Sequence, residues 1–383
     1  MPATKPLLVD DALWHRLLEL TGGAAALCYQ CGVCTALCPW GDLRQQPLSV
    51  RTFMRQAQLG LQDGDPSLWL CTTCAQCTAA CPRGVDIVTV LRSLRLVAWE
   101  LRQVEKGLPG VLWSVYWNNN PWNQPPSQRD NWARDLDIPA FDRDKHEILL
   151  YVGCTPSYDR RAQKIAQSLV RLFKAAGVEY GFLGQAEPCC GESVLSLGHR
   201  PYFNDVAQQA CRTFTEWGVT SLVTISPHCY DAFKNHYPAG LQPLHYTQYL
   251  AQLVESGRLR FEQPYENRVT FQDPCYLGRH NGEYQAPRQV LRSIPGLELV
   301  EMAYNQIDGL CCGGGGGRMW LETPPGERIS DLRLEQAFAS QAAVLATACP
   351  FCVACLEDSA RLKKLPGLQV LDIAEIAVRA IST

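Results

Sequence analysis

The sequence predicts an α+β multidomain protein, in which a mostly helical N-terminal domain precedes two repeated α/β modules with parallel sheets. Three observations support this fold class. One cysteine run occurs twice between residues 28 and 82, helix-like segments surround both copies, and the second half of the chain repeats itself at a near-constant offset. The 383 residues are enough for two or three domains, each with its own core.

The first element of this prediction is the pair of cysteine runs. They read Cys28-x₂-Cys31-x₂-Cys34-x₃-Cys38-Pro39 and Cys71-x₂-Cys74-x₂-Cys77-x₃-Cys81-Pro82. This spacing is typical of a bacterial two-cluster ferredoxin, in which three close thiolates bind one [4Fe–4S] cube and the fourth cysteine reaches the other cube. The spacing therefore assigns one cubane cluster to Cys28, Cys31, Cys34 and Cys81, and the second to Cys71, Cys74, Cys77 and Cys38.

Zinc is the alternative metal for these runs, since paired cysteines also bind zinc tetrahedrally. A zinc ion needs only four thiolates and leaves the repeated x₃-Cys-Pro ending unexplained, so the spacing favours iron–sulfur clusters. The chain has 19 cysteines and no secretory signal at its start. We therefore expect metal thiolates in a reducing cytoplasm rather than disulfides.

The residues around the two runs have a helical pattern. Apolar side chains recur at helical spacing in residues 49–58 and 85–105, which predicts a mostly helical ferredoxin domain over residues 1–107. Residues 108–143 are rich in Trp and Pro and are predicted to be a linker. Five tryptophans lie between residues 99 and 132. We expect them to pack the first domain against the next one, with a partner-docking or membrane-surface patch as the alternative.

From about residue 144 the chain repeats itself, at offsets of 121 to 123 residues. Strand-like segments such as 148–152 and 268–271 precede cysteines, and helix-like segments such as 160–176 follow. This alternation predicts two modules built on parallel sheets, over residues 144–262 and 263–383. The repeated landmarks are Cys154, Cys189-Cys190 and Cys229 in the first module, and Cys275, Cys311-Cys312 and Cys352 in the second.

The repeated cysteines are expected at the carboxyl edge of each sheet, where strands end and helices begin. Helix N-termini carry a partial positive charge, which suits an anionic cluster. The glycines from Gly313 to Gly317 would let the backbone approach such a cluster closely. A phosphate-binding loop is the competing interpretation of this run, but the Gly-Lys-Ser/Thr ending is missing.

The cysteine motif of the second module also has a family resemblance. Cys275, Cys311-Cys312-Gly313 and Cys349-Pro350-Phe351-Cys352 resemble the cysteine-rich "CCG" domain of heterodisulfide reductase. The whole chain is similar to the D-type or fused C and B subunits of that family, and to the soluble part of electron-transfer-flavoprotein:quinone oxidoreductases. The resemblance implies that this intact module holds one noncubane [4Fe–4S] cluster through Cys275, Cys311, Cys312, Cys349 and Cys352. Cys355 lies about one helical turn further on and is expected to be a buried neighbour.

The first module is degenerate, because Ser226 stands where the motif has a cysteine. Serine binds iron poorly, since soft thiolates suit these clusters. Three outcomes stay open for Cys154, Cys189, Cys190 and Cys229: a modified cluster, a zinc or iron site, or no metal. His228 is a candidate nitrogen ligand here, with a capping or surface role as the alternative. His245 and His280 are candidate proton carriers, with ordinary packing as the alternative.

Composition and missing motifs narrow the function. The net charge is −3 and no basic stripe is present, which excludes a nucleic-acid partner. No stretch reaches the ~18 apolar residues of a membrane span, so no transmembrane segment is expected in this chain. We find no serine-hydrolase or zinc-protease motif and no nucleotide fingerprint, and Cys211 lacks a basic setting that would activate it.

The sequence therefore predicts an iron–sulfur electron-transfer subunit in the cytoplasm, attached to a membrane only through a partner. The resemblance implies partners of two kinds: a flavoprotein on one side, and a quinone-reducing haem subunit or a thiol–disulfide partner on the other. The alternative is a catalytic heterodisulfide reductase subunit acting at the noncubane cluster. A zinc-bound scaffold is a third interpretation, against which the ferredoxin spacing counts.

Overall fold

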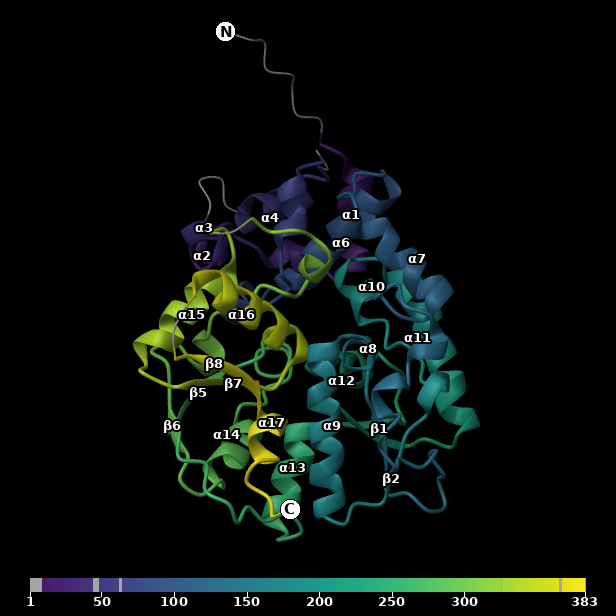
Figure 1. Ribbon diagram of the computed structural model, residues 1–383. Coiled ribbons are helices and arrows are strands. Elements are labelled where there is room, and N and C mark those ends of the chain that lie inside the picture. The colour runs from purple at the N-terminus through teal and green to yellow at the C-terminus, as the bar shows by residue number, and fades with distance from the viewer. Residues whose placement is uncertain (1–8, 44–47, 62–63, 325, 365–366, 383) are drawn as a thin grey trace.

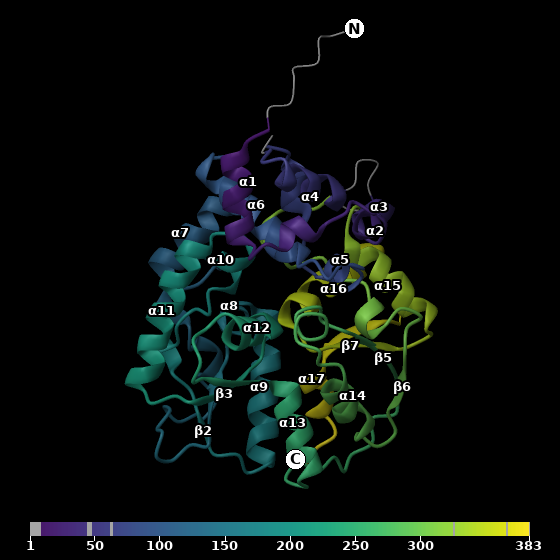
Figure 2. The same cartoon turned by 180° about the vertical axis from the view of Figure 1, so that it is seen from behind.

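A computed structural model describes residues 9–43, 48–61, 64–324, 326–364 and 367–382. Residues 1–8, where the sequence predicts no secretory signal, lie outside these ranges. A helical N-terminal domain sits across the ends of two α/β modules that lie side by side (Figures 1 and 2). Each module has a four-stranded parallel sheet, as the predicted fold class requires. Within the described ranges, no helix has the length and apolar character needed to cross a membrane.

The N-terminal domain is almost entirely helical. Predicted helices at residues 49–58 and 85–105 are observed as α4 and α6. Two one-turn helices, α2 and α5, each hold the third cysteine of a run and contact one another. The helices are α1 (Asp11–Leu20), α2 (Val33–Ala36), α3 (Trp40–Leu43), α4 (Val50–Gln58), α5 (Gln76–Ala79) and α6 (Ile87–Glu100).

Residues 108–143 contain more structure than a linker. An 11-residue helix, α7 (Leu108–Asn118), starts with proline in its first turn and ends where Asn119 adopts a left-handed conformation. Two 3₁₀ turns follow, at residues 126–128 and 131–133. The tryptophans divide: Trp99, Trp122 and Trp132 pack against other rings or the core, whereas Trp113 and Trp117 are 60% and 70% exposed.

Module 1 has the strand order β2-β1-β3-β4, with every pair parallel. In the central pair, Leu149 of β1 aligns with Leu222 of β3. Its elements are β1 (Ile148–Tyr151), α8 (Cys154–Tyr158), α9 (Arg160–Ala175), β2 (Tyr180–Gly181), α10 (Glu192–Ser196), α11 (Arg200–Glu216), β3 (Ser221–Thr224), α12 (Pro227–Asn235), β4 (Gln242–His245) and α13 (Tyr246–Glu255).

Module 2 repeats this topology in the order β6-β5-β7-β8, again with parallel pairs. Val269 of β5 aligns with Val344 of β7, as Leu149 does with Leu222. The repeat seen in the sequence is therefore a repeat of fold. The elements are β5 (Arg268–Gln272), α14 (Gln285–Arg292), β6 (Glu298–Val300), α15 (Ile329–Ala339), β7 (Val344–Thr347), α16 (Pro350–Lys363), β8 (Gln369–Asp372) and α17 (Ile373–Ala377).

The two modules share one hydrophobic core. Helices α9 and α13 of module 1 pack against α14, α16 and α17 of module 2. Buried residues from both sheets, including Leu150 and Phe271, belong to the same apolar cluster. Arg161 adds ion pairs across the interface, to Glu357 at 2.6 Å and to Glu375 at 2.9 Å. The shared core fixes the relative positions of the cysteine-bearing edges.

Candidate metal centres

The first candidate site combines three cysteines of the first run with the last cysteine of the second. Its four thiols line one cavity together with Arg51 and Arg83. Positive φ angles at Gln30 and Gly32 turn the chain back on itself between successive cysteines. Cys31 is exposed to solvent, whereas Cys34 is buried. The fold thus brings together the set predicted from spacing, namely Cys28, Cys31, Cys34 and Cys81.

The second candidate site is more deeply buried. The first run contributes Cys38, which lies among the thiols of Cys71 and Cys74. Burial, and then the charges of these neighbouring thiols, raise the pKa of Cys38 to about 12. The pKa of Cys77 is raised for the same two reasons. Since iron binds the thiolate, a cation is needed to deprotonate such a set.

The third candidate site lies at the carboxyl edge of the module 2 sheet. Cys275 follows β5, and Cys349 and Cys352 stand at the start of α16. The doublet lies in a loop, where the N–H of Gly313 donates to the Cys311 thiol at 3.3 Å. All five cysteines expected here are buried: Cys275, Cys311, Cys312, Cys349 and Cys352.

One thiol of this third site, that of Cys349, has a strongly lowered pKa. Burial raises its pKa, but hydrogen bonds from Cys352 and His228 outweigh burial and lower the pKa to about 5. His228 belongs to module 1, where the sequence made it a candidate metal ligand. The structure instead stacks its ring 3.9 Å from that of Tyr276 and places its Nδ1 3.2 Å from Glu192. This imidazole therefore serves the module 2 site.

The remaining four cysteines gather at the equivalent edge of module 1. The Sγ atoms of Cys190 and Cys229 are 3.3 Å apart. Cys189 contacts both Cys190 and Cys154, so the four thiols form a continuous row. All of them are buried, as is Ser226 in the place of the fifth.

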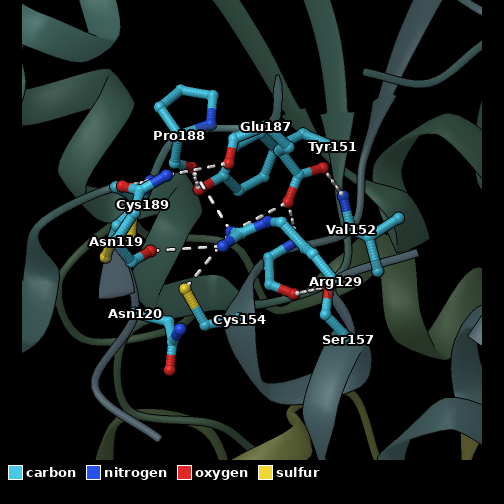
Figure 3. Close-up of polar contacts among 12 residues, drawn as sticks. Asn119, Asn120, Arg129, Tyr151, Val152, Cys154, Ser157, Glu187, Pro188 and Cys189 are labelled. Carbon is cyan, nitrogen blue, oxygen red and sulfur yellow. Dashed lines mark hydrogen bonds and ion pairs between the residues drawn. The ribbon is translucent and has the colours of Figure 1, made fainter. Parts of the chain in front are cut away.

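A buried arginine joins the module 1 row, as Figure 3 shows. Arg129 donates to the Cys154 thiol at 3.3 Å and pairs with Glu187 at 3.2 Å. Glu187 in turn accepts the N–H groups of Val152 and Gly153, at 2.8 and 2.9 Å. Burial lowers the pKa of Arg129, but the charges of Cys154 and Glu187 outweigh it, so the group stays a cation. Arg129 was not predicted from the sequence, since a single arginine in a proline-rich stretch gives no signal.

The second and third sites meet at the junction of the N-terminal domain with module 2. Cys74 and Cys311 are near enough for each thiol to shift the pKa of the other, upward for Cys74 and downward for Cys311. Here two glycines of the run have a role in addition to the one expected. A Cβ at Gly315 or Gly316 would overlap the backbone of Thr72 or Cys71, so these two glycines let the N-terminal domain come into close contact.

A buried arginine of α6 secures the same junction. Arg95 is fully buried and donates to the carbonyl groups of Leu68, Cys71, Ser196 and Gly316, at 2.7 to 3.0 Å. These acceptors belong to the N-terminal domain, module 1 and module 2. One guanidinium therefore ties all three parts together.

A cavity of about 700 Å³ opens beside the third site. It is lined by Cys312, Gly313 and Gly314 on one side and by Trp40 and Arg318 on the other. Cys355 also lines it and is half-buried rather than fully buried. The cavity gives a small molecule or a partner side chain access to the cysteine doublet.

Three other residues singled out in the sequence, two histidines and a cysteine, are packed within the fold. His245 is fully buried, contacts the Thr247 hydroxyl at 2.7 Å, and begins α13; burial lowers its pKa to about 3. His280 stacks on Tyr276 at 4.3 Å and contacts the Thr73 carbonyl at 2.8 Å. Cys211 lies within α11, where burial raises its pKa.

The donor sets suit clusters better than single ions. Among the described residues, no three His, Cys, Asp or Glu side chains are arranged to hold one metal ion. A four-iron cube takes one thiolate at each iron, so its ligands stand further apart than those of a single ion. The first three sites contain only soft sulfur donors, which is the chemistry that iron–sulfur clusters select.

Comparison with known proteins agrees with this chemistry. Residues 24–85 match the 4Fe-4S dicluster domain family, and residues 148–234 and 269–357 each match the cysteine-rich domain family called CCG. The chain belongs to the heterodisulfide reductase-related iron–sulfur proteins. The family match in residues 148–234 includes module 1 despite Ser226.

Three relatives illustrate the range of this family. The EtfAB:quinone oxidoreductase of Syntrophomonas wolfei is 35% identical over 69% of this chain and 39% of its own length. A probable membrane-anchored ferredoxin of Chromohalobacter salexigens is 33% identical over 99% and 63%. The D-type component of the dihydromethanophenazine:CoB–CoM heterodisulfide reductase of Methanosarcina barkeri is 32% identical over 69% and 65%. The chain thus spans between 39% and 65% of these relatives' lengths.

Proposed function

We propose that this chain is an electron-transfer subunit with three iron–sulfur clusters in series. The observation that carries the proposal is the junction of the ferredoxin-type sites with the CCG site of module 2. There Arg279, four residues after Cys275, donates to the Cys74 carbonyl at 2.6 Å, and the thiols of Cys74 and Cys311 act on one another. Electrons move one at a time between clusters, and ligands that lie this near one another keep the transfer distance short.

Each cluster would be held by the cysteines of one of the first three candidate sites. Each cubane takes three cysteines from one run and the last cysteine of the other run. The noncubane cluster takes the five cysteines of module 2. When bound, these groups supply one-electron redox chemistry. The chain's own contribution is to bury the second and third sites, while the exposed Cys31 leaves the first site open to a partner. The proposed ligands are Cys28, Cys31, Cys34 and Cys81 for the first cubane, Cys71, Cys74, Cys77 and Cys38 for the second, and Cys275, Cys311, Cys312, Cys349 and Cys352 for the noncubane cluster.

We further propose a flavoprotein as one partner and a membrane quinone- or haem-bearing subunit as the other. The relative named EtfAB:quinone oxidoreductase supports the first pairing and the relative named a membrane-anchored ferredoxin supports the second. On this proposal the chain acts in the cytoplasm, at a membrane surface.

Metal analysis with EPR on anaerobically purified protein tests the proposal. We expect about twelve irons per chain, no zinc, and a noncubane signal distinct from those of the cubanes. About sixteen irons would mean that module 1 also holds a cluster. About eight irons without a noncubane signal would contradict the three-cluster relay, and zinc in place of iron would reject electron transfer altogether.

A second candidate function is disulfide reduction at the noncubane site. The cavity beside Cys312 favours it, because a small disulfide could reach the cysteine doublet there. This function predicts turnover of a small heterodisulfide with a reduced viologen dye as the electron donor. It also predicts that added thiol changes the noncubane EPR signal. Absence of both effects in protein with a full iron content would leave electron transfer as the function.

A further inference from the structure

Arg279 occupies the junction between the second and third sites. Its Nε donates to the carbonyl of Cys74 at 2.6 Å, across 205 residues of sequence. Its Nη1 donates to the carbonyls of Gly309 at 2.6 Å and Ile307 at 3.2 Å, in the loop that leads to the doublet. One side chain therefore joins a cysteine of the N-terminal domain to the segment that positions Cys311.

The remaining nitrogen of Arg279 is one of several buried arginine nitrogens that have no acceptor among the described residues. Its Nη2 is buried and has no hydrogen-bond partner among the described residues. A buried N–H without an acceptor costs about 1–3 kcal/mol, so its retention calls for an acceptor that the protein atoms do not supply. Cys74, Cys275 and Cys311 are the anionic groups that act most strongly on this guanidinium. The charge of Arg279 is therefore felt chiefly at these three sulfur atoms.

The surroundings of Arg279 differ from those of two other deeply placed arginines. Arg129 is paired with Glu187, and Arg288 is paired with Asp273 and Glu301. Within the described part of the chain, Arg279 donates its hydrogen bonds to carbonyl groups, which are neutral. Its positive charge is thus directed at the sulfur ligands of two sites rather than cancelled by a carboxylate.

From this geometry we propose that Arg279 is a positioning and potential-setting residue shared by the second cubane and the noncubane cluster. The inference rests on the proposed function. A fixed positive charge and an N–H donor beside cluster sulfur favour the reduced, more negative state and raise the reduction potential. Because it acts on both clusters at once, Arg279 raises their two potentials together relative to that of the first cubane.

The first cubane provides an internal reference for a test. Its cavity is lined by Arg51 and Arg83, and Arg279 is absent from that lining. Replacement of Arg279 should therefore change two of the three clusters. Arg279→Gln removes the charge and keeps a donor, whereas Arg279→Lys keeps the charge and loses the planar fork that binds the three carbonyl groups. Arg258→Gln is a matched control, since Arg258 contacts Glu147 and the Gly177 carbonyl.

The experiment is an EPR-monitored redox titration of the full chain. In Arg279→Gln we expect the reduction equilibrium constants of the second cubane and the noncubane cluster to fall about threefold to tenfold, or about 28–59 mV for one electron. The first cubane and the Arg258→Gln control should keep their potentials. Arg279→Lys should keep all three potentials but slow electron equilibration between the second and third sites in freeze-quench measurements.

Two results would overturn this inference: unchanged potentials of both clusters in Arg279→Gln, or equal shifts of all three. Should Arg279→Gln fail to fold, unslowed equilibration in Arg279→Lys would overturn it equally. Failure of the proposed function looks different, because the unmodified protein would then lack iron. An unmodified protein with about twelve irons and an insensitive Arg279→Gln variant would reject only the role of Arg279.

Discussion

Modules 1 and 2 have the same strand order and share four equivalent cysteine positions, yet these cysteines have different neighbours. In module 1 a fixed ion pair, Arg129 with Glu187, lies against Cys154. In module 2 the thiol of Cys311 lies near Cys74 of the N-terminal domain. The sequence after each doublet follows this difference, with Gly-Glu-Ser-Val in module 1 and a run of glycines in module 2. A duplicated scaffold therefore acquires its role from what packs against the carboxyl edge of its sheet.

One copy of the module also supports the other. His228 occupies the position that Phe351 has in module 2, and it reaches across to hydrogen-bond Cys349. Glu192, in the position of Gly314, holds that imidazole. Module 1 thus has Ser226 in place of a cysteine. Helix α12, which follows Ser226 and carries His228, forms part of the module 2 site instead.

The largest expected effect is on iron content, when one of two equivalent cysteines is replaced by serine. Cys312→Ser should lower the iron content from about twelve to about eight per chain, because it removes one of five noncubane ligands. Cys190→Ser, at the same position in module 1, should leave the iron content unchanged. Metal analysis of both variants checks this pair. Equal iron loss in the two variants would mean that the modules are alike in binding a cluster.

The second effect concerns the ion pair that module 1 places beside its cysteines. Arg129→Met should lower the free energy of unfolding by about 3–5 kcal/mol, because it leaves the buried Glu187 carboxylate without its cation. The double variant Arg129→Met/Glu187→Gln should recover part of this loss. Urea denaturation of anaerobic protein measures both. Full retention of stability in the single variant would show that the pair is not needed.

The third effect tests the close contact between module 2 and the N-terminal domain. Gly316→Ala should cost about 1–3 kcal/mol in unfolding free energy, since its Cβ would overlap the Cys71 carbonyl and its φ is +60°. Gly110→Ala is the control, because a Cβ there meets no atom within 4 Å. Thermal unfolding of the two variants gives the comparison, and equal melting temperatures would contradict it.

The last effect is small for each pH unit and concerns two equivalent helix starts. His245 begins α13 and Asp372 begins α17, and burial keeps both uncharged: the pKa of His245 falls to about 3, and that of Asp372 rises to about 8. A carboxyl with a raised pKa binds its proton more tightly when folded, so its contribution to stability is lost as pH rises from about 4 to 8.

Asp372→Asn keeps the cap and removes this titration. Relative to the unmodified protein, we expect the variant to gain up to about 1.4 kcal/mol for each pH unit across that window. Urea midpoints at about pH 5, 6 and 7 measure the gain. A difference that does not change with pH would mean that Asp372 is ionised in the folded protein.

Much of the fold could be predicted because it depends on local or periodic signals. The offsets of 121 to 123 residues predicted two equal topologies, and the x₃-Cys-Pro ending predicted that Cys38 and Cys81 cross between sites. The rest depends on contacts between distant parts of the chain. His228, Arg129 and Arg279 act on residues 25 to 205 positions away or in another module, and no local pattern specifies such a partner.

The contacts of Arg95 have a consequence for the synthesis of the protein on the ribosome. The guanidinium of Arg95 can donate to all four of its carbonyl acceptors only after Gly316, 221 residues later in the chain, has been synthesised. At roughly 5–20 residues per second, a ribosome needs about 10 to 40 s to bridge that interval. During this time the second cysteine run emerges without the glycines that will cover it. Until module 2 has been synthesised and folded, the second cysteine run of the nascent chain is open on the side that these glycines cover in the folded protein.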